Sequence, residues 1–476
     1  MFRQFILVSF AFFLLVSRVR ADVGVVLNES LDTSVARITG SGHSAVYLSR
    51  ICPASPVKMR LCGPHEEGSV LSNYTTLGEN QPFQWNIAPL SVYLYGVTDP
   101  QDRPLFASQK IKSLLEENYR DKALRDYCDG PPCTVSKNAE WREMVGASTS
   151  RSIYILVVRT TVQQDEEIIA RFNSLPNQNH FNAFTRNCAN FTRDTVNAYF
   201  PHATRGDYIN DFGMTSPKAI ARSFARYAHR HPDDQYRVLH FGQIPGTIKR
   251  STVTRDGTEQ LYHSKKLLVP MVLFASHELP FVAASYIFTG RFNPETEYEK
   301  FPTTDATELN DEIKWQKSAA NTAFIEELGS RQQDEKAEFT GTVAEWAQYH
   351  RDFNAIVAES KREEILPENQ SPGNLLKALD EESTPVLDDK GHLWLQIEDR
   401  AQMSKVGLSP SDILASGSDV RLAFQIMVGH VDSELKSPSH SREPMPEFRE
   451  NWLLLQQAFS TLQNSADIQQ VPKKGN

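Results

Sequence analysis

Runs of apolar residues bounded by polar ones predict a chain of mixed α and β structure. Residues 152–161, SIYILVVRTT, form a β-branched run typical of a buried strand, and residues 163–172 follow with a helical pattern. Residues 43–50, HSAVYLSR, hold a short apolar run between two serines, which favours a strand. Along residues 189–200 the apolar positions recur at helical spacing until Pro201 ends the pattern.

Beyond about residue 305 the chain becomes polar and mostly helical in pattern. Thr342 and Glu345 match the capping box that opens many helices, and the residues after them place apolar side chains on one face. Residues 392–398 alternate like a short strand. We therefore expect residues 306–476 to form a mainly helical C-terminal region with a disordered tail, suited to binding a protein partner or acting as a scaffold.

The first 21 residues have the features of a secretion signal. A basic start at Arg3 precedes an apolar core over residues 5–16, and Val19 and Ala21 occupy the positions that a signal peptidase reads. The leader holds three arginines and no acid, so its removal moves the net charge from −9 to −12. We expect an extracytoplasmic, acidic protein that does not bind nucleic acid, although an uncleaved N-terminal anchor is the alternative.

A second apolar stretch, residues 267–290, lies within an apolar extension expected over residues 246–305. Its length would cross a bilayer, but Pro270 and Pro280 and the His-Glu pair between them argue against a straight transmembrane helix. Two interpretations stay open. The stretch forms two buried elements joined at a turn, or it forms a hairpin that contacts a membrane or a lipid groove.

Five cysteines in an oxidising compartment leave one without a disulfide partner. Cys52 and Cys62 close a short loop, and Cys128 and Cys133 close a tighter one, so we expect each pair to form a local disulfide. The remaining cysteine, Cys188, is then either a buried small residue, an intermolecular bridge or a functional thiol.

The surroundings of Cys188 favour a functional thiol. It stands at the start of the helix predicted over residues 189–200, where backbone N–H groups and the helix dipole favour a thiolate. Asn187, just before it, also has a purely structural explanation, because asparagine caps helices well.

Other patterns do not support a cofactor or a metal. Residues 40–45 fit a G-x-G-x-x-A dinucleotide fingerprint, but a strand follows instead of the helix that this motif needs. SHELPF, residues 276–281, begins like a zinc-protease motif, yet Phe281 replaces the second histidine. We therefore expect neither cofactor nor metal ion.

A Gly-His-x-x-x-Tyr-Leu strand at residues 42–48 and an Asn-Cys-x-x-Phe helix start at residues 187–191 together resemble the circularly permuted papain-like thiol enzymes. This superfamily includes permuted NlpC-type peptidases, lecithin retinol acyltransferase and a bacterial envelope family with a lipoprotein N-acyltransferase. The resemblance covers roughly residues 35–200. It implies an α+β fold, in which a small antiparallel sheet packs on the nucleophile helix, with Cys188 as nucleophile and His43 as general base.

On this view residues 22–245 form the thiol-enzyme domain, with a helical insertion at about 107–130. The third catalytic residue is less defined. If the strand from His43 pairs as a hairpin with residues 70–77, setting Ser49 opposite Val70, the residue beside His43 falls between Asn73 and Glu79. Glu79 would stabilise an imidazolium through its charge, whereas Asn73 would only orient the ring.

Three functions stay open. An acyl-thioester on Cys188 would pass its acyl group to an amine, as in a lipid or lipoprotein N-acyltransferase fed by phospholipid, or to water, as in an amidase or peptidase acting on cell-wall or peptide substrates. The third is a non-catalytic envelope scaffold. A glycan at Asn190, two residues from the thiol, would be awkward, so a bacterial periplasm is favoured over a eukaryotic secretory path.

Overall fold

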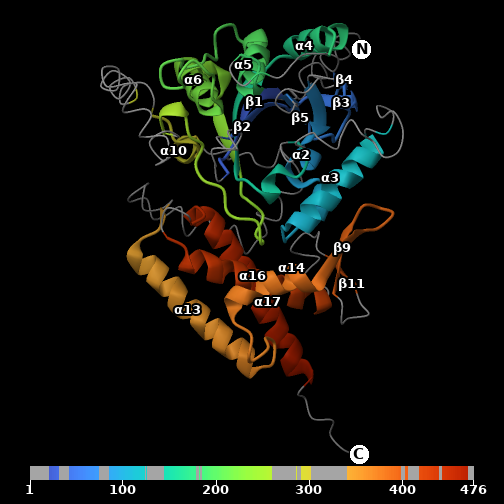
Figure 1. The fold of residues 1–476 in the computed structure, drawn as a ribbon, viewed down its shortest axis with the longest axis vertical. Coiled ribbons are helices and arrows are strands. Elements are labelled where there is room, and N and C mark those ends of the chain that lie inside the picture. Colours follow the sequence, from blue (N-terminus) through green and yellow to red (C-terminus); the bar gives the residue numbers. More distant parts are fainter. Residues whose placement is uncertain are drawn as a thin grey trace, which may run out of the picture.

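The structure is a computed structural model that describes residues 21–31, 42–73, 85–123, 125, 144–177, 182, 185–259, 286, 291–301, 340–397, 403–405, 417–438 and 442–469. It is a mixed α+β protein with an antiparallel sheet and several helices. In Figure 1 the sheet and the helices α4, α5 and α6 form the upper part of the molecule, and the C-terminal helices form the lower part.

Six antiparallel strands form the main sheet in the order β6-β5-β2-β1-β7-β8. They are β1 (Ala21–Asn28), β2 (His43–Leu48), β5 (Ser69–Asn73), β6 (Trp85–Pro89), β7 (Ile153–Thr160) and β8 (Arg237–Phe241). The central strand β1 was not predicted from the sequence. A signal cut after Ala21 would leave β1 intact from Asp22 onward, where Asp22 pairs with Arg237.

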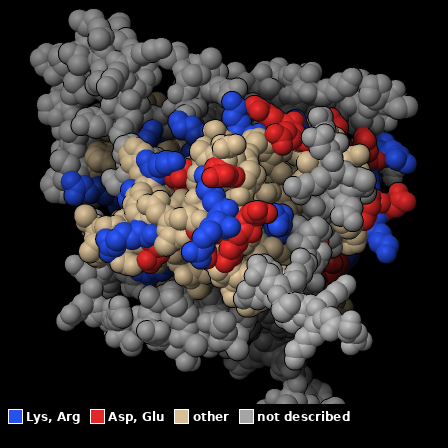
Figure 2. Space-filling model, turned by 90° about the horizontal axis from the view of Figure 1, so that it is seen from below, with Lys and Arg blue, Asp and Glu red and all other residues tan. Residues whose placement is uncertain are grey.

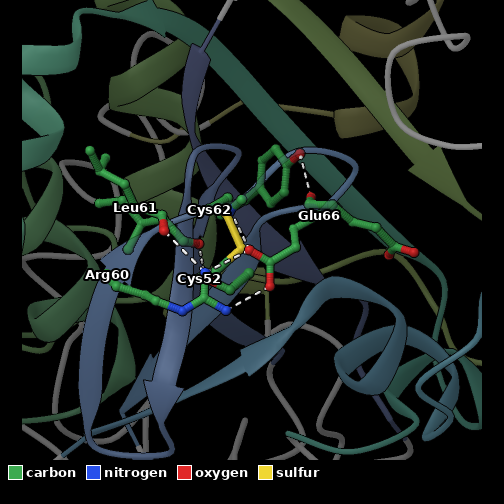
Figure 3. Close-up of a disulfide and its surroundings, with 10 residues drawn as sticks. Cys52, Arg60, Leu61, Cys62 and Glu66 are labelled. Atoms are coloured by element: carbon green, nitrogen blue, oxygen red, sulfur yellow. Dashed lines mark hydrogen bonds and ion pairs between the residues drawn. A yellow bond between two sulfur atoms is a disulfide. The ribbon is translucent and has the colours of Figure 1, made fainter.

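A two-stranded hairpin carries the disulfide between Cys52 and Cys62. Its strands are β3 (Ile51–Ser55) and β4 (Lys58–Leu61), and the two cysteine Cα atoms lie 4.9 Å apart. Figure 3 shows the sulfur–sulfur bond beside the exposed ion pair of Arg60 and Glu66, whose closest N–O distance is 2.6 Å. This predicted disulfide is confirmed, while the expected bridge between Cys128 and Cys133 lies outside the described residues.

Helices cover both faces of the main sheet and build the C-terminal region. They are α2 (Leu90–Tyr95), α3 (Gln109–Ala123), α4 (Val162–Ser174), α5 (Cys188–Tyr199), α6 (Pro217–Arg230), α10 (Pro294–Lys300), α13 (Val343–Arg362), α14 (Pro372–Glu382), α16 (Gly417–Lys436) and α17 (Met445–Gln469), with short 3-10 turns η2 (Pro100–Asp102), η6 (Ala147–Thr149) and η7 (Pro232–Asp234). A small sheet of β9 (Ser383–Leu387), β10 (Leu393–Ile397) and β11 (Met403–Lys405) completes the C-terminal region.

Alternation along the strands divides the buried side chains into two cores. Val46 and Leu48 of β2 belong to a core that includes apolar residues of α4, α5 and α6. Ala45 and Tyr47 point to the other face and join a core that runs through α2 and α3 into the C-terminal helices. Period-two alternation thus sends neighbouring residues of one strand to different parts of the molecule.

The strongest sequence patterns gave the right elements. The predicted strand at 152–161 is β7, the predicted helix at 163–172 is α4, and the capping box of Thr342 and Glu345 opens α13. The helical insertion expected at 107–130 contains α3. Residues 267–290 lie outside the described part of the chain except Tyr286.

Candidate active site

Cys188 is the first residue of α5, and its helix start is held firmly. The Asn187 side chain accepts a hydrogen bond from the Asn190 backbone N–H at 2.9 Å, and the Asn190 side chain accepts one from the Asn187 N–H at 3.3 Å. Asn187 Nδ2 also donates to the Thr215 carbonyl at 2.9 Å, and Asn190 Nδ2 donates to the Thr215 hydroxyl at 3.1 Å. This reciprocal capping box fixes the backbone that carries the half-buried Cys188 thiol.

The direction of α5 shows at which end of the sheet strands Cys188 lies. The helix packs on β2, β5 and β1. At its far end Tyr199 donates a hydrogen bond to Asp165 at 3.2 Å, and Asp165 pairs with Arg50 at 3.6 Å, just past the end of β2. Twelve helical residues span roughly 17 Å, close to the length of a six-residue strand. The start of α5 therefore lies toward the end of the sheet at which β2 begins with His43.

His43 is buried at that edge and its ring is held by a serine. The ring Nε2 lies 2.8 Å from the Ser72 hydroxyl oxygen, and the His43 residue is only 6% exposed. Gly42 before it has a φ of +112°, and a Cβ there would come within 2.6 Å of the Thr254 side chain. The Gly-His motif thus needs its glycine for backbone conformation and space. A strand follows this glycine, and not a phosphate-binding helix.

Strand alternation puts His43 on the same face as Ala45 and Tyr47, the face covered by α2. Ser72 shares this face, since it alternates with Leu71 of the other core. The helix of Cys188 covers the opposite face. A contact between the Cys188 thiol and the His43 imidazole must therefore pass around the end of β2, where His43 is the terminal residue.

The predicted third residues have different outcomes. Asn73 ends β5 at the same edge and is buried, and it alternates onto the α5 face with Leu71. Glu79 lies outside the described residues. The β2–β5 ladder sets Tyr47 opposite Val70, so the expected register, with Ser49 in that place, was wrong by two residues. A shift of two residues preserves the faces, so Asn73 lies on the face of Leu71 in both registers.

Sequence reasoning missed Ser72 and also missed Glu29. Glu29 continues β1 past the pair of Asn28 and His43, and its backbone N–H donates to the Ser152 carbonyl at 3.0 Å. Its carboxylate accepts a 2.6 Å hydrogen bond from the Ser251 hydroxyl. Burial raises the pKa of Glu29 to about 7, partly offset by the Arg250 charge. This acid could have been found from the sequence if residues 21–28 had been recognised as a strand.

A buried ionic cluster joins this edge to the C-terminal helices. Arg250 Nη2 lies 2.8 Å from a Glu447 oxygen, and its Nη1 lies 3.7 Å from Glu443. Glu443 in turn lies 3.0 Å from the His430 ring nitrogen. His430, Glu434 and Glu443 have atoms that could bind a metal ion within 4.8 Å of one another. Cys52, Cys62 and Glu66 form a second such group, but its two cysteines are joined in the disulfide.

No described helix is long and apolar enough to cross a membrane. Figure 2, seen from the side of the C-terminal helices, shows basic and acidic side chains interspersed among uncharged residues on the described part of that face. Comparison with family models, with curated proteins and with solved structures finds no match to this chain. The likeness to papain-like thiol enzymes therefore rests on its short sequence motifs.

Proposed function

We propose that this chain is an extracytoplasmic acyl-transfer enzyme of permuted papain-like type that works through a thioester on Cys188. The observation that carries the proposal is the rigidly capped start of α5, which presents a thiol at the sheet edge where His43 opens β2. A helix N-terminus lowers the pKa of a thiol, and an imidazole reached around the end of β2 would give it a proton acceptor.

The reaction takes two steps. Cys188 passes its proton to His43, and the thiolate sulfur forms a bond to the acyl carbon of an ester or amide. The bond from that carbon to the leaving oxygen or nitrogen breaks, and the leaving group takes the proton from His43. Attack by an amine then yields an amide and regenerates the thiol, whereas attack by water yields a carboxylic acid.

The residues around His43 have supporting roles in this scheme. Because Nε2 lies against Ser72, we assign the proton transfer to Nδ1, directly or through one water around the end of β2. Asn73 lies at the same end of the sheet but on the α5 face, so a role for it in orienting His43 requires a contact around the end of β2. Glu79 is the acidic alternative.

We favour a lipid or lipoprotein N-acyltransferase, with phospholipid as acyl donor, because residues 267–290 are the most apolar stretch of the sequence after the predicted signal. Hydrolysis of cell-wall or peptide amides is the alternative within the same chemistry. The two differ in the acceptor: a thioester isolated on Cys188 should pass to an added amine in the first case and decay in water in the second.

The scaffold alternative is less favoured by the C-terminal packing. The apolar face of α13, which the sequence offered to a partner, packs inside the chain. Trp346 and Tyr349 of α13 lie against Phe448 and Trp452 of α17 with ring centroids 4.7–5.1 Å apart.

The test is the pH dependence of alkylation at each cysteine, mapped by peptide mass spectrometry in the unreduced protein. We expect Cys188 to react at a pH below the ordinary thiol pKa of about 8.5, and His43→Ala to raise that midpoint by about 1 unit or more. His65→Ala, an exposed histidine, is the matched control and should leave the midpoint unchanged. A Cys188 that is inert, disulfide-bonded or indifferent to His43 would favour the scaffold.

A further inference from the structure

Three side chains of the kinds that bind metal ions converge between α16 and α17, which pack side by side (Figure 1). His430 and Glu434 stand four positions apart in α16, so they project from the same side of that helix. Glu443 lies just before the first residue of α17. One ligand atom from each of the three lies within 4.8 Å of the other two. The packing of two helices thus brings three candidate metal ligands together.

All three side chains lie deep inside the C-terminal region. His430 is 6% exposed, Glu434 is 5% exposed and Glu443 is 3% exposed. A carboxylate at this depth is poorly solvated by water, so it is stable only when it is paired with a cationic group or bound to a metal ion. The two acids of this group therefore need positive charge close by.

The guanidinium group of Arg250 is directed mainly at another acid. Its Nη1 and Nη2 atoms lie 3.2 Å and 2.8 Å from the two carboxylate oxygens of Glu447. Its closest approach to Glu443 is longer, at 3.7 Å. Glu434 and Glu443 therefore depend on His430, whose imidazole is cationic only when both ring nitrogens carry a proton. A divalent cation would supply the positive charge that a neutral imidazole does not.

The distances within the group match those between ligands of a single metal ion. His430 Nε2 lies 3.1 Å and 3.0 Å from the two oxygens of Glu443. Asn451 Nδ2 lies 3.3 Å from the same ring nitrogen and 3.3–3.4 Å from the same oxygens. Ligand atoms at about 2.0–2.1 Å from a tetrahedral zinc ion are about 3.3 Å from one another. A half-turn of the Asn451 amide would put its Oδ1 in the place of Nδ2 and make it a fourth ligand.

The carboxylate of Glu434 is oriented by the backbone of its neighbour in the group. Its Oε2 accepts a hydrogen bond from the Glu443 backbone N–H at 2.7 Å. Hydrogen bonds of this kind hold the carboxylate ligands of metal sites in position. The second oxygen of Glu434 is then the atom that would bind the ion.

We propose that His430, Glu434 and Glu443 bind a zinc ion that fastens the end of α16 to the start of α17. Asn451 supplies the fourth ligand. An imidazole with carboxylates suits zinc, whereas magnesium and calcium prefer oxygen ligands alone. Four protein ligands leave no open position for a substrate, so the ion has a structural role. Residues 276–281 gave no reason to expect a metal ion, and the ligands found here meet only through the packing of α17 on α16.

The experiment measures zinc binding by the full chain carrying Cys188→Ala, so that the candidate catalytic thiol cannot supply a ligand. Metal is removed with a chelator, and the protein is titrated with Zn²⁺ against a coloured competing chelator. We expect one ion per chain, bound about 100-fold more weakly in Glu434→Gln. The glutamine oxygen can still accept from the Glu443 N–H, so this variant should fold. Asp432→Asn is the matched control, because Asp432 is also a buried acid of α16 but pairs with Lys436.

Cobalt(II) gives a second measurement, because its visible spectrum reports the geometry around the ion. We expect the intense bands of a tetrahedral ion in the control and their loss in Glu434→Gln and His430→Gln. Zinc should also raise the melting temperature of the control and leave that of Glu434→Gln unchanged. Equal zinc affinity in Glu434→Gln and the control, or failure of the control to bind one ion per chain, would overturn the proposal. A cobalt–thiolate band would place the ion at a cysteine and overturn it as well.

Discussion

The two faces of the six-stranded sheet are buried by parts of the chain at different sequence distances. The face of Val46 and Leu48 is closed by α4, α5 and α6, which follow β7 closely in the sequence. The face of Ala45 and Tyr47 is closed by α2 and α3 and, beyond them, by helices from the far end of the chain. The thiol stands over the first face, and the imidazole belongs to the second.

This difference separates the setting of the thiol from the attachment of the C-terminal region. The α5 face is apolar, and its helix start is fixed by neutral hydrogen bonds around Asn187. The C-terminal region is joined to the sheet edge through a buried cluster of charges around Arg250. Changes to the cluster should therefore affect the whole fold, whereas changes at Asn187 should affect one helix start and its thiol.

The largest effect is expected from Arg250→Met. It leaves Glu443 and Glu447 buried without their guanidinium partner, and breaking a buried ion pair in this way costs about 3–5 kcal/mol. Urea unfolding measures the loss. Arg60→Met, which breaks the exposed pair with Glu66, is the control and should change stability by less than about 1 kcal/mol. Equal losses in the two variants would show that the cluster does not hold the C-terminal region to the sheet.

A smaller effect is expected when the disulfide is removed by Cys52→Ser with Cys62→Ser. The bridge closes a loop with a sequence separation of 10, and loops of this size gain about 2–3 kcal/mol from a disulfide. The hairpin is also tied to α4, because Asn173 exchanges two hydrogen bonds with the Met59 backbone. We therefore expect a lower melting temperature with Cys188 alkylation unchanged. A changed Cys188 midpoint would link the hairpin to the thiol site.

Glu29 should make stability depend on pH. Its pKa is raised from 4.5 to about 7 in the fold, so its contribution is fully present below pH 4.5 and is lost as pH rises through 7. Glu29→Gln should remove this loss and flatten the stability profile between pH 5 and pH 8 by about 2 kcal/mol. Urea midpoints across that range give the comparison, with Glu66→Gln as a surface control. A profile as steep in Glu29→Gln as in the wild type would contradict the assignment.

The sequence predicted the α5 face better than the other face, for physical reasons. The helix of Cys188 is stopped by a proline and preceded by an asparagine cap, and β7 is a continuous β-branched run, so local pattern determines both. The contacts of Arg250 with Glu443 and Glu447 join residues almost two hundred positions apart. No local pattern reports such a pairing.

In the candidate site, too, contacts that depend on strand pairing were not predicted from the sequence. Cys188 and His43 are candidates on the strength of their motifs and of the cysteine count, and they stay predictions. Ser72 was missed because its contact with His43 depends on the β2–β5 register, which we predicted two residues away from the observed one. Glu29 was missed because residues 21–28, which form β1, were not recognised as a strand.

The smallest effect on stability, and the most specific for the thiol, is expected from Asn187→Ala. Losing a helix N-cap costs about 1 kcal/mol, and a frayed first turn no longer aligns its N–H groups near the Cys188 sulfur. The alkylation midpoint of Cys188 should therefore rise while the fold persists. Ser216→Ala removes the equivalent cap of α6, where the serine hydroxyl accepts from the Ala219 N–H at 3.1 Å.

This control should cost a similar amount of stability and leave the Cys188 midpoint where it is. If both cap variants shift the midpoint equally, the thiol responds to general loosening of the α5 face rather than to its own helix start. If neither shifts it, the helix terminus does not activate Cys188, and any low midpoint must come from His43 at the edge of the sheet. The pair of variants thus separates the contribution of α5 from that of β2.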